Sequence, residues 1–249
     1  MAKPRVLILR APGTNCDLET AHAFERAGGV AERLHVNQIV AEPNSLKDFQ
    51  ILCLPGGFSY GDDIAAGRIL GNRMRRHLAG ALGEFKAAGK LILGICNGFQ
   101  ILLKTDVLLP MPAEGALATL ALNDSGRFLD RWVQLQVRGD QSVFFRGIQN
   151  MYLPIAHAEG RFVPRDSQTL ASLESAGQLC LRYSAVENPN GAVADVAGVC
   201  DETGRVCGLM PHPERHLDPT HHPQWTRRES QPPAGDGLKV FQNAVGYFA

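Results

Sequence analysis

The chain has 249 residues, with 25 basic and 25 acidic side chains, so its formal net charge is zero. Hydrophobic residues make up 45% and charged residues 20% of it, which excludes a disordered chain and predicts a soluble globular protein. The balanced charge argues against a nucleic-acid partner, because binding to phosphates needs an excess of Lys and Arg. We also expect no membrane partner, since no apolar stretch approaches the roughly 20 residues that span a bilayer.

Residues 5–104 alternate between strand and helix patterns. Short apolar runs at 5–10, 31–39, 50–54 and 90–95 predict strands, and amphipathic spacing at 17–28, 72–88 and 97–104 predicts helices. Such alternation is typical of an α/β fold, in which helices flank an open, mostly parallel sheet.

The second half of the chain has a different pattern. Residues 131–137 alternate between polar and apolar, and the runs at 192–199 and 205–210 flank a hairpin turn at 201–204. We expect these segments to add antiparallel strands to the sheet. A Pro-, Gly- and His-rich stretch at 217–237 predicts a long loop, and 238–248 predicts a closing helix. With no repeat or linker in view, we expect one domain over 1–249.

The six cysteines are scattered, and no secretory signal sequence precedes them. We therefore expect a reducing, cytoplasmic location in which the thiols stay free. Five of them read as small core residues. They are Cys16, Cys53, Cys180, Cys200 and Cys207.

The sixth cysteine, Cys96, lies where an apolar strand runs directly into a helix. Gly94 and Gly98 stand two residues before and after it, which is the G-x-C-x-G pattern of a nucleophile elbow. A thiol at a helix N-terminus meets backbone N–H groups and a positive dipole, both of which favour the thiolate. The spacing therefore predicts a nucleophile; the alternative is a buried structural cysteine.

A cysteine nucleophile needs a base, and the base needs an acceptor that orients it. His212 and Glu214 are separated by one residue after an apolar strand, between the fixed φ angles of Pro211 and Pro213. Glu214 can thus bind one imidazole nitrogen while the other faces Cys96. Taken alone, this segment could equally be a solvated surface loop.

Acyl transfer through a thiolate also needs N–H donors for an oxyanion. Gly56 and Gly57 follow the strand at 50–54, where they let the backbone approach a ligand closely. The N–H groups of Gly57 and Asn97 are our candidate donors. The alternative is that the two glycines only form a turn.

These three elements, in this order, resemble the class I (triad) glutamine amidotransferases, and Gln100 completes their G-x-C-x-G-x-Q pattern. Further motifs resemble one branch of that family, the glutaminase subunits of phosphoribosylformylglycinamidine synthases in purine biosynthesis. These motifs lie at 15–17, 55–62, 125–128, 154–162, 188–191 and 210–215.

The resemblance implies a flavodoxin-like three-layer fold and a single amidotransferase domain. It also implies that Cys96 attacks the glutamine amide, that His212 and Glu214 complete the triad, and that Gly56 and Gln100 help to bind substrate. Ammonia would pass to a separate synthetase subunit that uses ATP and Mg²⁺, with a small third subunit bridging the two. This subunit itself would hold no cofactor, and neither G-x-x-x-x-G-K-[ST] nor G-x-G-x-x-G occurs in it.

Four histidines near Glu214, at positions 212, 216, 221 and 222, raise the possibility of a metal site. We expect none, because Pro213 prevents helical pairing of His212 with His216. His157 and Glu159 could line the mouth of the site, contact a partner or satisfy backbone at a strand end.

A basic cluster in the 68–77 segment reads as a solvated helix face or as a docking surface for the synthetase. It consists of Arg68, Arg73, Arg75, Arg76 and His77.

Two rival functions remain at the level of sequence. The chain could be a triad amidotransferase that serves another synthetase, or a non-enzymatic stress protein of the same fold with Cys96 as a redox sensor. The complete Cys–His–Glu set favours an enzyme.

Overall fold

A nine-stranded sheet forms the centre of the structure, a computed structural model that describes residues 2–184, 186–227, 230 and 232–248. Its strands, in sheet order, are β2 (Val30–His35), β1 (Arg5–Arg10), β3 (Ile51–Leu54), β4 (Leu91–Ile95), β11 (Val206–Leu209), β10 (Val196–Cys200), β9 (Leu181–Tyr183), β6 (Leu129–Val137) and β7 (Asn150–His157).

The first five strands of this order are parallel to one another. The order β2-β1-β3-β4 with a fifth parallel strand is the flavodoxin-like arrangement, which binds ligands beyond the carboxyl ends of its strands. The continuous apolar runs of β3 and β4 are buried along their whole length, as parallel strands covered on both faces should be. The predicted mostly parallel α/β sheet is therefore confirmed.

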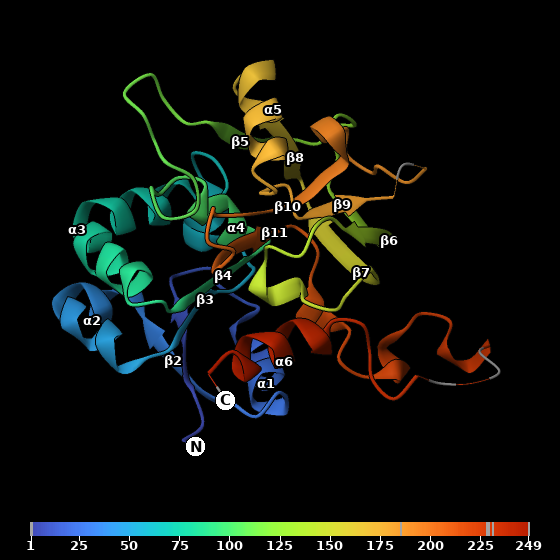
Figure 1. Cartoon of the computed structure of the whole chain (residues 1–249), viewed down its shortest axis with the longest axis horizontal. Coiled ribbons are helices and arrows are strands. Elements are labelled where there is room, and N and C mark those ends of the chain that lie inside the picture. The colour runs from blue at the N-terminus through green and yellow to red at the C-terminus, as the bar shows by residue number, and fades with distance from the viewer. Residues whose placement is uncertain (1, 185, 228–229, 231, 249) are drawn as a thin grey trace.

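Helices cover both faces of the parallel half (Figure 1). Right-handed crossovers place α1 (Asp17–Arg26) and α3 (Arg68–Ala87) on opposite faces, because the connections from β1 to β2 and from β3 to β4 run in opposite directions along the sheet. The closing helix α6 (Leu238–Gly246) packs on α1, where Phe24 and Phe241 meet edge to face at 4.9 Å. Helix α4 (Asn97–Leu102) packs on α3.

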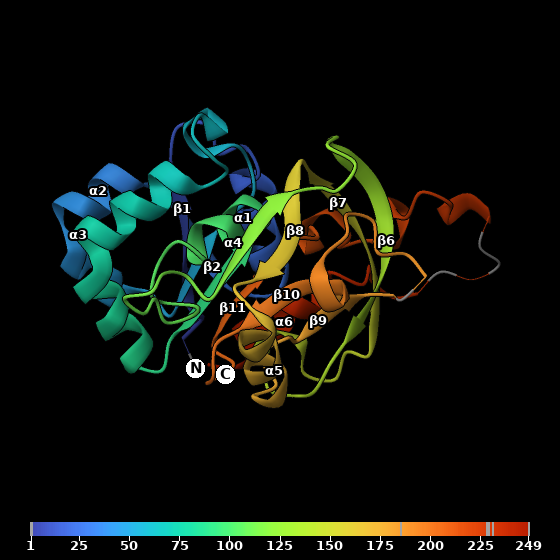
Figure 2. The same ribbon diagram turned by 90° about the horizontal axis from the view of Figure 1, so that it is seen from above.

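The other half of the sheet is antiparallel, as the alternating patterns predict. Strands β10 and β11 form the expected hairpin, and β9, β6 and β7 continue the sheet antiparallel. A separate pair, β5 (Ala118–Leu122) and β8 (Glu159–Pro164), lies with α5 (Ser167–Ser175) on the side of the molecule that is uppermost in Figure 1 and faces the viewer in Figure 2.

Some elements differ from the prediction. The strand expected over 31–39 ends at His35, whose imidazole accepts a hydrogen bond from Asn37 N and caps the short helix α2 (Val36–Ala41). Helix α3 begins at Arg68, before the expected residue 72, because Gly67 in a left-handed conformation turns the chain into it. The periodicity also gave no signal for β5, β7, β8, β9 or α5.

The predicted long loop after residue 216 is held against the antiparallel strands. Its His222 ring packs with Trp132 and Tyr152, and Tyr152 N donates to the Asp236 carboxylate at 2.8 Å. Among the described residues, no helix is both long and apolar enough to cross a membrane.

Candidate active site

The predicted nucleophile and base lie at the carboxyl edge of two neighbouring strands. Strands β4 and β11 pair in parallel with Ile95 opposite Leu209. Cys96 follows the first strand directly, and its N–H donates to Leu209 O at 2.7 Å. His212 follows the second strand, and its N–H donates to Pro154 O of β7 at 2.9 Å. Residues far apart in the sequence therefore share one edge of the sheet.

Cys96 has the strained backbone of a nucleophile elbow. Its φ of 50° and ψ of −104° lie in a region that non-glycine residues seldom occupy, at a cost of about 1–3 kcal/mol. The glycines around it make the turn possible. A Cβ on Gly98 would lie 1.9 Å from Leu54 O, and one on Gly94 would lie 2.7 Å from the Gly98 backbone. The G-x-C-x-G pattern thus reflects close packing of α4 on β3 and β4.

His212 and Glu214 form a buried pair beside the elbow. The imidazole Nδ1 lies 2.6 Å from Glu214 Oε1, and both residues are 3% exposed or less. Burial alone would lower the pKa of His212, but the Glu214 carboxylate and the Cys96 thiolate raise that pKa well above its ordinary value. The arrangement therefore favours an imidazolium next to Cys96.

A small cavity of about 200 Å³ opens beside the Cys96 thiol. Of the two candidate oxyanion donors, Gly57 lines this cavity. Asn97 follows Cys96 as the first residue of α4, where the first backbone N–H groups have no partner within the helix. The Asn97 side chain is fully engaged. It accepts from Ser59 N at 3.2 Å and donates to Asp62 at 3.1 Å and Gln100 at 3.0 Å.

The two residues expected to bind substrate have different surroundings. Gln100 lines the cavity, but its amide already bridges Asn97 Nδ2 and the backbone carbonyl of Glu159. Gly56 lies behind His212, because a Cβ there would come within 2.8 Å of the imidazole Cε1. Gln100 and Gly56 therefore shape the site through their contacts with other protein groups.

Cys16, which the sequence predicts to be a small core residue, is buried, but its thiol also lies within 4.8 Å of a ring nitrogen of His212. Cys16 follows β1 at the same edge of the sheet, and Arg215 Nη2 lies 3.2 Å from its Sγ. Arg215 Nε also donates to Glu19 at 3.0 Å. Only the order of the strands brings these residues together, so no local sequence pattern indicates the contact.

The donor atoms of Cys16, Glu19, His212 and Glu214 all lie within 4.8 Å of one another, which is the spacing of a possible metal site. The guanidinium of Arg215 already supplies a cation to two of these four groups. This set differs from the four-histidine cluster weighed in the sequence, whose other members bind elsewhere: His216 to Tyr152 O, and His221 and His222 to nearby backbone N–H groups.

The basic cluster of the 68–77 segment does not form one surface. Arg73 donates to the Tyr60 hydroxyl and to Asn37, whereas Arg75 turns toward Met111. Arg68 and Arg75 line one hollow, and Arg73 and Arg76 line another. These contacts favour the interpretation as a polar helix face.

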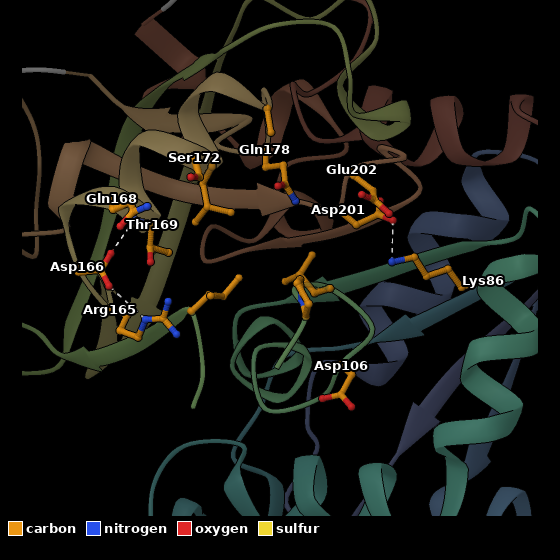
Figure 3. A pocket seen from close by; sticks show the side chains of 15 residues that line it. Lys86, Asp106, Arg165, Asp166, Gln168, Thr169, Ser172, Gln178, Asp201 and Glu202 are labelled. Carbon is orange, nitrogen blue, oxygen red and sulfur yellow. Dashed lines mark hydrogen bonds and ion pairs between the residues drawn. The ribbon is translucent and has the colours of Figure 1, made fainter. Parts of the chain in front are cut away.

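A larger cavity, about 560 Å³, lies away from Cys96 (Figure 3). It is bordered by α5 and by the β10–β11 turn, at the opposite end of β11 from His212. Figure 3 shows Lys86 paired with Asp201, whose carboxylate also accepts from Val206 N and Arg205 N. The charged groups of Lys86 and Asp201 at this cavity are thus already paired with each other.

The comparisons with known proteins agree with this geometry. Residues 3–248 match the model of the CobB/CobQ-like glutamine amidotransferase domain. The chain belongs to this glutamine amidotransferase family. Two curated relatives are phosphoribosylformylglycinamidine synthase subunits PurQ. One, from Dehalococcoides mccartyi, is 46% identical over 98% of both chains, and one from Methanococcus maripaludis is 40% identical over 98% of this chain and 97% of its own.

Solved structures show the same likeness. A chain in the PurLQS structure from Thermotoga maritima is 33% identical, with a TM-score of 0.78 and full coverage of both chains. A putative GMP synthase subunit from Thermoplasma acidophilum is 15% identical with a TM-score of 0.58, which shows the shared fold alone. The amidotransferase fold and class predicted from the sequence are therefore confirmed.

Proposed function

We propose that Cys96, His212 and Glu214 form a catalytic triad that hydrolyses glutamine to glutamate and ammonia. The observation that carries this proposal is the buried His212–Glu214 pair, with 2.6 Å between Nδ1 and Oε1, next to a strained cysteine at the adjoining strand end. A nucleophile, a base and a group that orients the base are the components that covalent acyl transfer requires.

In this reaction the Cys96 thiolate attacks the carboxamide carbon, and the backbone N–H groups of Gly57 and Asn97 stabilise the oxyanion. The His212 imidazolium gives its proton to the amide nitrogen, the C–N bond breaks and ammonia leaves. A water molecule then attacks the thioester while His212 accepts its proton, which releases glutamate and restores the thiolate.

The chain is the glutaminase subunit of a phosphoribosylformylglycinamidine synthase in purine biosynthesis, as its PurQ relatives indicate. It supplies ammonia for the conversion of formylglycinamide ribonucleotide to the amidine on a separate synthetase subunit. The solved PurLQS complex from Thermotoga maritima supports an assembly with that synthetase and a small third subunit. The synthetase uses ATP and Mg²⁺, whereas this subunit needs no cofactor of its own. We place the complex in the cytoplasm.

The mouth of the cavity offers a surface for the synthetase. Phe58, which lines the cavity, is 45% exposed, and its ring lies 6.4 Å from that of Phe128, which is 50% exposed. Large aromatic side chains exposed as a pair are typical of interface cores. Docking there would cover the opening beside Cys96, so that ammonia leaves toward the partner.

The test is the reconstituted complex with Cys96→Ala. We expect glutamine-dependent amidine formation to be abolished, while formation from added ammonium salts continues at the wild-type rate. Because the ammonia reaction uses only the synthetase site, it controls for an active synthetase, and co-elution of the variant with the synthetase on size-exclusion chromatography controls for assembly. Glutamine-dependent activity that survives in the variant would show that Cys96 is not the nucleophile.

The two rivals have distinct outcomes in the same system. A complex that hydrolyses glutamine but forms no amidine would point to another acceptor. Peroxide oxidation of Cys96 in a protein with no glutaminase activity in the complex would revive the redox-sensor hypothesis.

A further inference from the structure

His157 is a buried polar side chain in the wall of the Cys96 cavity. It is 3% exposed, and the residue before it contacts the nucleophile, since the Cys96 thiol lies 3.7 Å from Ala156 O. Its ring occupies the place that a side chain at residue 160 would take: a Cβ on Gly160 would lie 2.2 Å from the imidazole Cε1. The ring is therefore locked beside the reaction site.

The hydrogen bonds around His157 assign its tautomer. The Asn123 amide donates from Nδ2 to two backbone carbonyls, those of Arg127 and His157, both at 2.9 Å. This fixes the Asn123 carbonyl oxygen toward His157 Nδ1, 3.1 Å away. Since that oxygen can only accept, Nδ1 carries the proton.

The remaining ring nitrogen must then be an acceptor. Burial, assisted by the nearby His212, lowers the pKa of His157 to about 4, so the ring holds one proton at neutral pH. That proton is on Nδ1, which leaves a lone pair on Nε2. Within the described part of the chain, no donor reaches Nε2. A buried acceptor without a donor is costly, which indicates that a ligand N–H completes the site.

Glutamine brings two kinds of N–H group to this cavity, the α-ammonium and the carboxamide. The carboxylates of Asp62 and Glu159 also line the cavity and suit a cation better than a neutral ring does. His157 follows Ala156, whose carbonyl oxygen contacts the Cys96 thiol, so its ring is better placed to meet the carboxamide that Cys96 attacks.

We propose that His157 Nε2 accepts a hydrogen bond from the carboxamide nitrogen of glutamine and holds that nitrogen until it leaves as ammonia. This inference rests on the proposed glutaminase function. His157 exchanges no proton in the reaction. By accepting one N–H, it turns the nitrogen lone pair toward His212, which supplies the proton for departure.

The test compares two substrates of the reconstituted complex. Glutamate γ-methyl ester forms the same thioester as glutamine, but its leaving oxygen has no N–H to donate. In His157→Phe, which keeps an aromatic ring and removes the acceptor, we expect kcat/KM for glutamine to fall roughly tenfold to hundredfold, the worth of one buried hydrogen bond. The ester should lose far less.

A second variant separates the acceptor from the packing of the ring. His157→Gln loses the Nδ1 bond to Asn123, as His157→Phe does, but its Oε1 can accept near the place of Nε2. We expect it to recover most of the glutamine activity. An equal loss for both substrates in His157→Phe would overturn the proposal and indicate a structural role or a contact with the α-ammonium.

An NMR measurement covers the case in which His157→Phe does not fold. In Cys96→Ala protein with ¹⁵N-labelled histidine, Nε2 of His157 should resonate as an unprotonated nitrogen and shift when glutamine binds in the complex. A protonated Nε2, or no shift on binding, would contradict the proposal. Failure of the proposed glutaminase function can be distinguished from failure of this proposal, because the wild-type complex would then hydrolyse neither glutamine nor the ester.

Discussion

The Nδ1 atom of His212 lies 2.6 Å from Oε1 of Glu214, and the side chains of both residues are shielded from solvent. A carboxylate this close orients the ring and stabilises its protonated form. This pair therefore sets both the direction and the proton affinity of the candidate base.

Replacing Glu214 by Gln keeps an acceptor for Nδ1 but removes the negative charge. We expect kcat to fall by roughly 10²–10⁴-fold, with a smaller change in KM. Because the carboxylate raises the pKa of His212, its loss should lower that pKa and move the alkaline limb of the kcat/KM profile to lower pH. An unchanged alkaline limb would show that Glu214 acts by orientation alone. His212→Ala should lose more activity than Glu214→Ala.

Gly98 and Gly83 offer a matched pair of Gly→Ala substitutions in helices. At Gly98 the new Cβ would meet Leu54 O at 1.9 Å, so we expect a loss of several kcal/mol in unfolding free energy and displacement of the Cys96 elbow. At Gly83, an exposed position of α3, nothing lies within 4 Å of the new Cβ, and Ala should stabilise the protein by about 0.5–1 kcal/mol. Thermal melts and glutaminase rates measure both. A Gly98→Ala protein with native stability would contradict the packing described here.

The sequence predicted most of the parallel half and the candidate triad because their signals are local. Gly94, Cys96 and Gly98 fall within one turn, and His212 and Glu214 are two residues apart. The contacts of Cys16 with Arg215 and of Asn123 with His157 have no such signal, because strand order alone brings those residues together. Periodicity reports which face of an element is buried, not which element covers that face.

The α2 helix shows a second limit of the sequence analysis. Its start depends on the His35 side chain accepting from Asn37 N, and histidine is seldom read as an N-cap. Val36 and Ile39 fit a strand pattern and a helix pattern equally well over so short a run. The local cap decided between them, and the strand was therefore predicted too long.

The buried imidazole of His157 should make stability depend on pH. Its pKa is lowered from 6.5 in the unfolded chain to about 4 in the folded protein, so the unfolded chain binds more protons between these values. The contribution of the neutral His157 ring to the unfolding free energy is fully present above pH 6.5 and is lost as the pH falls toward 4. At pH 4.5 we expect the buried His157 to lower the unfolding free energy by roughly 2–3 kcal/mol relative to its value at pH 7.

Urea unfolding of wild-type and His157→Gln protein at pH 7 and pH 4.5 isolates this effect. Carboxylates titrate equally in both proteins, so the difference between the two pH dependences belongs to His157. We expect the wild type to lose more stability than the variant on acidification. Parallel curves would show that the ring does not stay neutral in the folded state.

Asp201 should be a stability determinant away from the active site. Its buried carboxylate accepts from Arg205 N at 3.1 Å, Val206 N at 3.0 Å and Lys86 Nζ at 2.9 Å. Asp201→Asn places an amide donor against these donors, and we expect a loss of about 2–4 kcal/mol.

Glu202→Gln, at the exposed neighbouring position, is the control for Asp201→Asn and should change stability by less than about 0.5 kcal/mol. Denaturant midpoints measure both variants. Equal midpoints would show that the turn does not depend on the buried carboxylate. Glutaminase kinetics at a temperature where both proteins are folded should be unaffected, because Asp201 lies at the far end of β11.

The position of β11 between β4 and β10 has a consequence for how the protein is made. During synthesis, β4 and Cys96 leave the ribosome early. The neighbouring strand β11, which His212 follows, is made only after the antiparallel strands β6, β7, β9 and β10. An unfinished chain therefore has a thiol without its base. The nascent subunit therefore cannot hydrolyse glutamine until β11, the last strand of the chain, inserts between β4 and β10.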